Sequence, residues 1–328
     1  MNLALTEPTH ARAGANLVRA RNELRAALAA PRRECASIGL VPTMGGLHEG
    51  HLSLLRAARA ECHVVVMSLF VNPAQFGPGE DLERYPRDEQ RDLALAAEAG
   101  VDLVYAPPVE EVYPPGFSTQ VEVEGLTEVL CGDPSRRGPG HFHGVTTVVA
   151  KLFNAVGPDV AYFGQKDAQQ VAAIRRMVRD LDIPLRIEAL PIVREPDGLA
   201  MSSRNAYLEP PERERATALW RALALAERVA REGSLSAALE AARGELAAAG
   251  VEPEYLEARD PDELTPVAEL GDGPVLIAVA ATVSGARLID NVLVDPDHFP
   301  DNGNPGRVRI QRRVPTLDAS SPSTEAGN

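Results

Sequence analysis

The sequence predicts an α/β protein in which a doubly wound parallel sheet is followed by a smaller α+β domain. Between residues 36 and 191, short apolar runs alternate with amphipathic helical segments, and polar residues almost never interrupt the runs. Strands with that character are buried on both faces of a parallel sheet. After about residue 193 the alternation stops, and two helical segments precede three strand-like runs. The change in pattern predicts a second domain.

The first half of the alternating region can be assigned element by element. Leu17, Leu24 and Leu28 recur at helical spacing, and Pro86 and Gly100 bracket another helical segment. The predicted order is a helix over 15–30, a strand over 36–42, a helix over 50–61, a strand over 63–72, a helix over 86–100 and a strand over 101–107.

The second half of the alternating region continues in the same way. It predicts a helix over 144–156, a strand over 160–164, a helix over 167–181 and a strand over 185–191. Ligands of open parallel sheets bind beyond the carboxyl ends of the strands. Any site is therefore expected in the loops that follow strands, namely 42–51, 72–80 and 164–170.

The rest of the chain predicts helices over 210–232 and 234–250, then strands over 254–260, 274–283 and 286–294. Beyond residue 300 the residues are mainly Pro, Gly, Ser, Asn and Arg without apolar periodicity, which is typical of disorder. The expected organisation is a loose leader (1–13), a sheet domain (14–192), an α+β domain (193–299) and a disordered tail (300–328).

Composition limits the function classes. The net charge of −14 argues against a general nucleic-acid or anionic-membrane surface, because both partners need a basic face. No apolar run reaches the ~18 residues that a membrane span needs. The three cysteines, Cys35, Cys62 and Cys131, form no C-x-x-C pair. We therefore expect a cytoplasmic protein without a disulfide framework, nucleic-acid partner or membrane anchor.

Two histidines at the start of the helix after the first buried strand are the strongest candidate site. His48 and His51 are three residues apart, so both project to one side of the first helical turn, beside its unpaired N–H groups. Gly45, Gly46 and Gly50 allow the backbone to approach a ligand closely. This arrangement suits phosphate oxygens, to which imidazoles can donate hydrogen bonds. A helix-capping pair or a metal pair is the alternative, although no third metal ligand has suitable spacing.

Two further loops carry polar side chains at strand ends. Asn72 and Gln75 can hold hydroxyl or carboxylate groups of a small substrate, although turn formation explains Asn72 equally well. Lys166 lies at the positive end of a predicted helix, a position that indicates a bound anion. Asp167 fits an N-cap, and Gln170 lies one turn after Lys166 on the same side.

Two remaining loops are less specific. Ser202, Ser203 and Arg204 lie where the proposed domains join and could hold phosphates, or could form an ordinary solvated loop. His141 lies in a glycine-rich turn before a helix and is ambiguous by itself.

Together these stretches resemble the pantothenate synthetase (pantoate–β-alanine ligase) family over residues 15 to 295. The resemblance is carried by "PTMGGLHEGHLSL", "VNPAQFGPGEDLERYPRD", "PGHFHGVTTVV", "FGQKDAQQ", "DGLAMSSRNAYL" and the late "ARLIDN". It implies a Rossmann-like sheet of the nucleotidyltransferase type with a C-terminal lid domain. It also implies a homodimer that uses Mg²⁺ and makes pantothenate from pantoate, β-alanine and ATP. Pantoyl adenylate would be the intermediate, and AMP and pyrophosphate the other products.

The resemblance also implies residue roles. The catalytic set would be His51, His48, Lys166 and Arg204, with His51 as the catalytic acid. Gln75 and Gln170 would bind pantoate, and Gln75 would later bind β-alanine. The residues that would bind ATP are Met44, Gly45, Gly46, Leu47, His48, Glu49, Gly50, His51, Gly164, Gln165, Lys166, Asp167, Val193, Met201, Ser202, Ser203 and Arg204.

The resemblance has one departure. The family usually reads Arg-Pro-Gly-His-Phe, whereas here Gly138 precedes Pro139 after a longer loop, so that Arg136 or Arg137 would have to substitute. Magnesium would be held mainly by the triphosphate. Asp88 and Asp92 are candidates only, and no protein ligand is assigned.

Two other functions fit parts of the pattern. Another nucleotidyltransferase of the same fold, such as a pantetheine-phosphate adenylyltransferase, would give no reason for Gln75 and Gln170 to face each other across a small pocket. A catalytically inactive nucleotide-binding regulator would be expected to have lost His51, Lys166 or Arg204, and all three are present.

Overall fold

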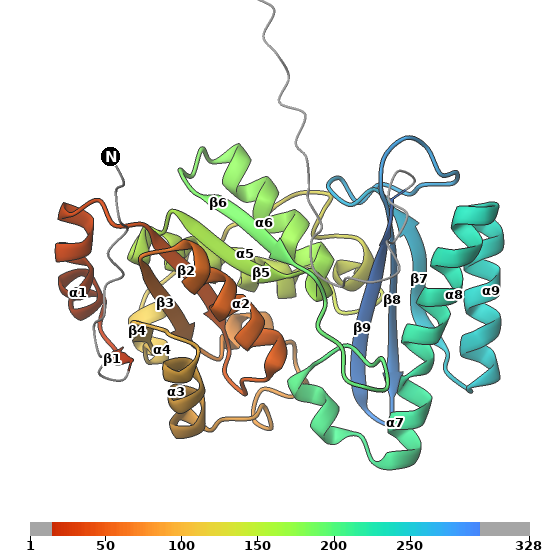
Figure 1. Cartoon of the computed structure of the whole chain (residues 1–328), viewed down its shortest axis with the longest axis horizontal. Helices are drawn as coiled ribbons and strands as arrows, with labels where there is room; N and C mark the ends of the chain where they lie inside the picture. The colour runs from red at the N-terminus through yellow and green to blue at the C-terminus, as the bar shows by residue number, and fades with distance from the viewer. Residues whose placement is uncertain (1–14, 296–328) are drawn as a thin grey trace, which may run out of the picture. The chain divides into compact units, whose positions relative to one another are not determined.

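The computed structural model describes residues 15–295; the expected leader and tail, 1–13 and 300–328, lie outside the described residues. Six parallel strands form the larger sheet, in the order β1–β4–β3–β2–β5–β6 (Figure 1). The strands are β1 (Asn16–Val18), β2 (Ile38–Thr43), β3 (Val64–Leu69), β4 (Leu103–Tyr105), β5 (Val160–Gly164) and β6 (Arg186–Leu190).

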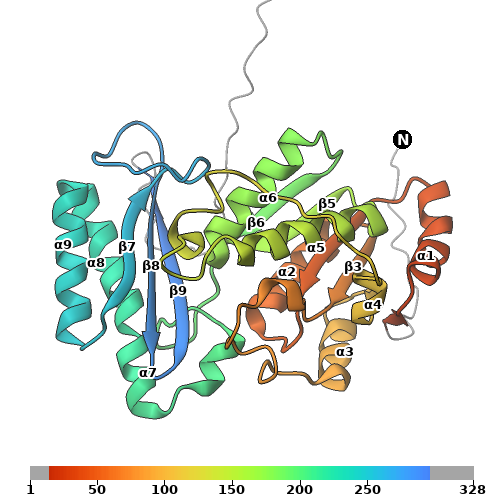
Figure 2. The ribbon, with the colours of Figure 1, turned by 180° about the vertical axis from the view of Figure 1, so that it is seen from behind.

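Helices cover both faces of this sheet. One face packs against α1 (Arg21–Arg33), α5 (Gly140–Val156) and α6 (Ala168–Asp180), and α2 (Glu49–Glu61) and α3 (Glu89–Glu98) pack on the other. Figure 1 views the sheet from the side of α2, and Figure 2 shows α5 and α6 across the opposite face. The short helix α4 (Val109–Val112) follows β4. The doubly wound parallel sheet predicted from the sequence is confirmed.

The uninterrupted apolar strands follow from this two-sided burial. Successive residues of a strand point to opposite faces. Leu40 and Val66 contact the cluster beneath α5, whereas their neighbours Val41 and Val65 contact the cluster beneath α2. All four are fully buried, so a polar residue at any of them would be left without water on either face.

The remaining elements form the predicted smaller α+β region. Its helices are α7 (Pro210–Ala216), α8 (Ala218–Glu232) and α9 (Leu235–Ala248). Its antiparallel strands are β7 (Pro253–Arg259), β8 (Val275–Val283) and β9 (Ala286–Val294), in the order β7–β8–β9. One face of this small sheet packs on α8 and α9. On its other face, Leu276, Ala278 and Ala280 of β8 belong to the core cluster of α5 and α6. The proposed division into 14–192 and 193–299 stays a prediction.

Two predicted elements were wrong in detail. The helix expected over 15–30 begins only at Arg21, because residues 16–18 pair with 103–105 as an edge strand, and tertiary pairing overrides local periodicity. The helix expected over 210–232 breaks at Thr217. The hydroxyl of Thr217 donates to the Glu214 carbonyl, and such bonds to the preceding turn bend helices.

Strand order locates the site. Successive strands run outward from β2 through β3 to β4, and then from β5 to β6 on the other side, so the direction reverses between β2 and β5. Parallel sheets bind ligands at this switch point, beyond the carboxyl ends of the strands. No helix within residues 15–295 combines the length and apolar character needed to cross a bilayer.

Candidate active site

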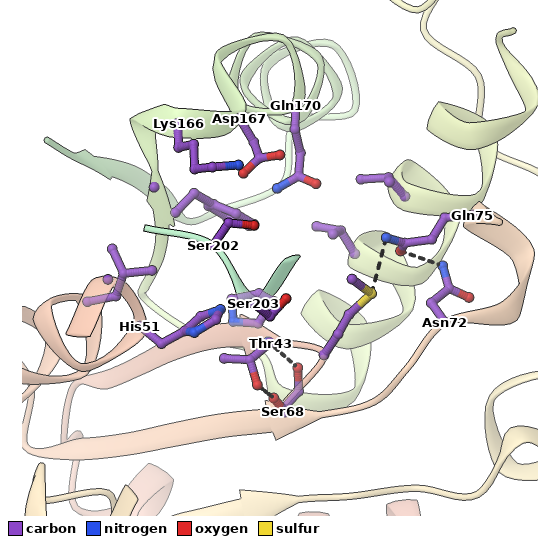
Figure 3. A pocket seen from close by; sticks show the side chains of 18 of the residues that line it. Thr43, His51, Ser68, Asn72, Gln75, Lys166, Asp167, Gln170, Ser202 and Ser203 are labelled. Atoms are coloured by element: carbon purple, nitrogen blue, oxygen red, sulfur yellow. Dashed lines mark hydrogen bonds between the residues drawn. The ribbon is translucent and has the colours of Figure 1, made fainter. Parts of the chain in front are cut away.

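A cavity of about 240 Å³ lies at the switch point. It brings together residues from the loops after β2, β3 and β5 and from the segment 191–204. Figure 3 shows Lys166 and Gln170 on one side of this cavity and His51 on another. The predicted site residues that line it are Met44, His48, Gly50, His51, Gln75, Gly164, Lys166, Asp167, Gln170, Val193, Met201, Ser202, Ser203 and Arg204.

Five predicted ATP-binding residues do not line the cavity. Leu47 is buried in the core, and Glu49 is exposed and paired with Arg56. The other three outside the lining are Gly45, Gly46 and Gln165. Any role of these five residues in binding ATP stays a prediction.

The turn after β2 is fixed from below by a buried carboxylate. Gly45 and Gly46 have φ values of +86° and +63°, which glycine adopts without strain. Asp92, only 1% exposed, accepts hydrogen bonds from the N–H groups of Gly46 (2.9 Å) and Leu47 (2.8 Å). These two N–H groups are therefore already occupied.

The two imidazoles are in the same tautomeric form, with the proton on Nε2. The Nδ1 atom of His48 accepts from the N–H of Gly50 at 3.2 Å, and Nδ1 of His51 accepts from the N–H of His48 at 3.4 Å. A neutral ring with an accepting Nδ1 carries its proton on Nε2. The ring centroids are 4.1 Å apart. Two Nε2–H donors are thus available side by side at the start of α2.

Both imidazoles are neutral at physiological pH. Burial, followed by the nearby charge of Lys166, lowers the pKa of His48 to about 4. Burial, followed by charge interactions with His48 and Lys166, lowers the pKa of His51 to about 3. The two rings therefore offer hydrogen-bond donors and no positive charge, because buried imidazolium ions side by side are disfavoured.

The loop after β3 separates two amides with different roles. Asn72 is 1% exposed: its side chain accepts from Tyr113 Oη (2.8 Å) and donates to the carbonyl of Gly144 (3.0 Å). It also caps the 3-10 turn η1 (Pro73–Gln75), which confirms the turn interpretation. Gln75 donates to Met44 Sδ at 3.3 Å. Because sulfur is a weak acceptor, a ligand oxygen could displace it from the Gln75 amide.

His141, ambiguous in the sequence, holds this loop. Its Nδ1 donates to the carbonyl of Gln75 at 2.7 Å, and its Nε2 lies 3.1 Å from Arg137 Nη1. Burial and the Arg137 charge lower the pKa of His141 to about 4, so the ring is neutral at physiological pH. Arg137 also forms an ion pair with Glu80.

Of the two arginines that could replace the usual family arginine, only Arg137 lies at the cavity. Arg136 points away from it, pairs with Glu257 at 3.0 Å and stacks over the ring of Tyr255 at 5.0 Å. The longer loop therefore still delivers one guanidinium to the cavity.

Beyond β5, two neighbouring glutamines point in different directions. Gln169 is buried and binds backbone groups of Leu126, Val129 and Cys131, so it fixes the loop before α5. Gln170 lines the cavity with Lys166, as Figure 3 shows. Asp167 occupies the N-cap position of α6, as the sequence suggested, but its side chain makes no capping hydrogen bond.

Arg204 is held by an acidic residue from another loop. Its Nε and Nη2 donate to the two carboxylate oxygens of Asp81 at 2.8 and 2.9 Å. Burial opposes ionisation of Asp81, but the Arg204 contacts outweigh it and hold the pKa of this carboxyl below its usual range. Ser202 caps the turn that contains Arg204, and the Ser203 hydroxyl donates to Tyr85 Oη at 3.3 Å. The phosphate-binding candidates are thus already ordered.

Sequence reasoning missed the apolar wall of the cavity. Val145, Val148, Val149 and Leu152 form a stripe on α5 that lines it. Apolar residues three or four positions apart on a helix can face either a ligand or the core, so the sequence pattern does not distinguish the two. Tyr85 and Asp92 were also missed as supports, because their partners lie far away in the sequence.

Neither of the two candidate magnesium ligands lines the cavity. Both oxygens of Asp92 are used by backbone N–H groups, and Asp88 caps α3 by accepting from the N–H of Arg91 at 3.0 Å. Among residues 15–295, no three His, Cys, Asp or Glu side chains gather in a way that could hold a metal ion.

Comparisons with known proteins agree with this geometry. The family described as Pantoate-beta-alanine ligase matches residues 16–293. Pantothenate synthetase from Moorella thermoacetica is 57% identical over 271 residues, which cover 82% of this chain and 94% of the relative. Pantothenate synthetase from Thermotoga neapolitana is 55% identical over 80% of this chain and 94% of its own length.

Two solved structures share the fold. Pantothenate synthetase from Thermus thermophilus has a TM-score of 0.81 and 51% identity, covering 86% of this chain and all of that one. Pantoate-beta-alanine ligase from Francisella tularensis, complexed with beta-gamma ATP and beta-alanine, has a TM-score of 0.70 and 32% identity over 85% and 97%. The match is to ligases, so the adenylyltransferase alternative is not favoured. The chain belongs to the pantoate-beta-alanine ligase family.

Proposed function

We propose that this cavity is where the enzyme joins pantoate to β-alanine at the expense of ATP, through a pantoyl adenylate. One observation carries the assignment to the cavity. Imidazole N–H donors, an ammonium group and a guanidinium group from three separate segments meet beside two amides and an apolar wall. These features suit a triphosphate next to a small hydroxy acid with a methylated carbon chain.

In the first step a carboxylate oxygen of pantoate attacks the α-phosphorus of ATP. The bond from that phosphorus to the bridging oxygen breaks, and pyrophosphate leaves with the electron pair. Such a reaction needs an aligned nucleophile and compensation of the charge that develops on phosphate oxygens. We assign the compensation to the Nε2–H groups of His48 and His51, to Lys166, and to Arg204. Gln75 and Gln170 hold pantoate.

In the second step the free amine of β-alanine attacks the carbonyl carbon of the adenylate. The bond from that carbon to the AMP oxygen breaks, AMP leaves with the electron pair, and the nitrogen loses a proton to water to give the amide. We assign β-alanine to Gln75, whose amide can both donate and accept. The stripe of Val145, Val148 and Leu152 would contact the two methyl groups of pantoate, where burial is favourable.

Four further assignments belong to this proposal. Mg²⁺ would be held by the triphosphate, since neither candidate carboxylate lines the cavity. The enzyme would be a homodimer, as the resemblance implies. The region 193–299 would act as a lid domain on the 14–192 domain. A cytoplasmic location is supported by Cys35, Cys62 and Cys131, which are all free thiols.

The test is an assay of AMP release from ATP with purified full-length protein. AMP is expected only when both pantoate and β-alanine are present, with one pantothenate formed per AMP. Pyrophosphate should form in a burst with pantoate alone, because adenylation precedes the amine. ADP formation, or steady AMP release without β-alanine, would contradict the proposal.

A further inference from the structure

Two polar residues of the late "ARLIDN" stretch have no part in the reaction described above. Asp290 and Asn291 lie in the middle of β9, between the apolar runs 288–289 and 292–294, and each is 3% exposed. Buried polar groups are unfavourable unless hydrogen bonds compensate them. The partners of these two side chains therefore indicate why the strand carries them.

Asn291 binds the turn that follows β5. Its Nδ2 donates to the backbone carbonyls of Gln165 at 2.9 Å and Lys166 at 3.0 Å. Both carbonyls belong to the 3-10 turn η3 (Gln165–Asp167), which supplies Lys166 and Asp167 to the cavity. Within the described residues, Oδ1 of Asn291 has no hydrogen-bond partner. The visible function of this amide is to fix the turn.

Asp290 binds the second segment that lines the cavity. Its carboxylate accepts from Nη1 and Nη2 of Arg194 at 2.6 and 3.0 Å. The same guanidinium donates to the carbonyl of Gly198 at 3.1 Å and lies 3.8 Å from the Trp220 ring centroid. This contact anchors the segment between Val193 and Met201, whose two ends are joined by a backbone hydrogen bond of 2.9 Å.

The geometry of a strand explains how adjacent residues reach both segments. Successive side chains point to opposite faces of a sheet. Leu288 and Val292 share a face with Asp290 and pack in the α8–α9 cluster, whereas Ile289 shares a face with Asn291 and packs against the α5–α6 cluster. Asp290 and Asn291 thus bind two segments of the cavity wall, the turn at Lys166 and the segment that contains Arg194.

We propose that Asp290 and Asn291 are positioning residues of the ATP site, which set the spacing between the Lys166 turn and the Val193–Met201 segment. This inference rests on the proposed function of the cavity. Both residues lie outside its lining and instead line a neighbouring cavity of about 420 Å³. They act through Lys166 and Arg194 and do not take part in the chemistry.

The test compares Asn291→Ala with Val292→Ala in the full-length enzyme. Val292 is the next residue of β9 and 9% exposed, so its truncation disturbs the strand without touching the turn. We expect Asn291→Ala to raise the KM for ATP and the calorimetric Kd of ATP about tenfold, because two buried hydrogen bonds are lost. The KM values for pantoate and β-alanine should stay within twofold. Val292→Ala should lower the Tm and leave every KM within twofold.

A lowered Tm with an unchanged KM and Kd for ATP in Asn291→Ala would overturn the inference, since the residue would then be only structural. If that variant does not fold, Asn291→Ser, which keeps a hydroxyl donor, is measured against the same thresholds. Asp290→Asn, which keeps the size but weakens the contact with Arg194, should also raise the Kd of ATP. The binding measurement needs no turnover, so wild-type protein that binds ATP but forms no AMP would refute the proposed function alone.

Discussion

At the scale of single residues, spacing in the sequence locates the two histidines but does not determine their charge. Their pairing at the start of a helix after a buried strand could be read from positions 48 and 51. Their protonation could not, because it depends on Lys166, which is more than a hundred residues away, and on burial by other segments. Both rings are neutral and present Nε2–H donors.

A neutral donor at position 51 predicts a graded effect of substitution. His51→Ala should reduce the rate of adenylation by roughly 10²–10³-fold, the loss typical of a missing transition-state donor. His51→Gln should also reduce it strongly but less, because the glutamine amide can still donate. Single-turnover formation of pyrophosphate from ATP and pantoate measures both rates, and near-normal adenylation by His51→Gln would contradict the role.

The pH profile of the wild-type enzyme serves as the control for this assignment. Because the pKa of His51 is about 3 in the free enzyme, the neutral donor form is fully populated from pH 6 to 8. The value of kcat/KM, which reports ionisation of the free enzyme, should show no His51 inflection in that range. A steady fall as the pH rises from 6 would instead indicate that a protonated ring is required.

At the scale of an element, the turn after β2 depends on a helix that the sequence does not associate with it. Gly45 and Gly46 adopt the positive φ values of this turn, which glycine tolerates. The support by Asp92 on α3 could not be predicted, because a buried aspartate on a helix has no local signal that names its partner. Sequence patterns predict strands and helices well for the same reason that they predict this contact poorly: periodicity is local.

Asp92 predicts a difference between two carboxylates of the same region. Asp92→Asn keeps the size of the side chain but replaces one carboxylate oxygen by an NH₂ group, which cannot accept a hydrogen bond. One of the two backbone N–H groups of the turn then loses its acceptor, so kcat/KM should fall about tenfold or more. Asp88→Asn is the matched control, because Asp88 is exposed and asparagine is an equally good N-cap. Its kinetics should not change.

The dependence of the rate on free Mg²⁺ separates support of the turn from metal binding. For both variants, half-maximal activity should occur at the wild-type Mg²⁺ concentration. A large increase in the Mg²⁺ required by Asp92→Asn, with normal activity at saturation, would instead assign Asp92 to the metal.

At the scale of the whole described chain, the two sheets share one hydrophobic cluster. Leu276, Ala278 and Ala280 of β8 pack with residues of α5 and α6. The change of pattern after residue 193 predicted the small sheet correctly. Its packing could not be foreseen, because β8 is apolar on both faces and sequence alone does not say what covers each.

Shared packing predicts that the two regions unfold together. Trp220, the single tryptophan, lies on α8, so its fluorescence reports on the C-terminal region. Far-UV circular dichroism reports on the whole chain. The two urea transitions should coincide in midpoint and slope, as two-state unfolding requires. Separate midpoints would show that the cluster does not couple the regions.

The ion pairs around the cavity have a consequence for how the substrate arrives. Arg204 is matched by Asp81 and Arg137 by Glu80, and both imidazoles are uncharged. An approaching nucleotide therefore meets little long-range attraction from a molecule that carries an excess of negative charge. Capture of the nucleotide should be slow relative to the diffusion limit and should not be slowed by added salt, because salt screens the repulsion between two negative molecules. Selectivity should then arise after contact, when a phosphate group replaces Asp81 as the partner of Arg204 or Glu80 as the partner of Arg137.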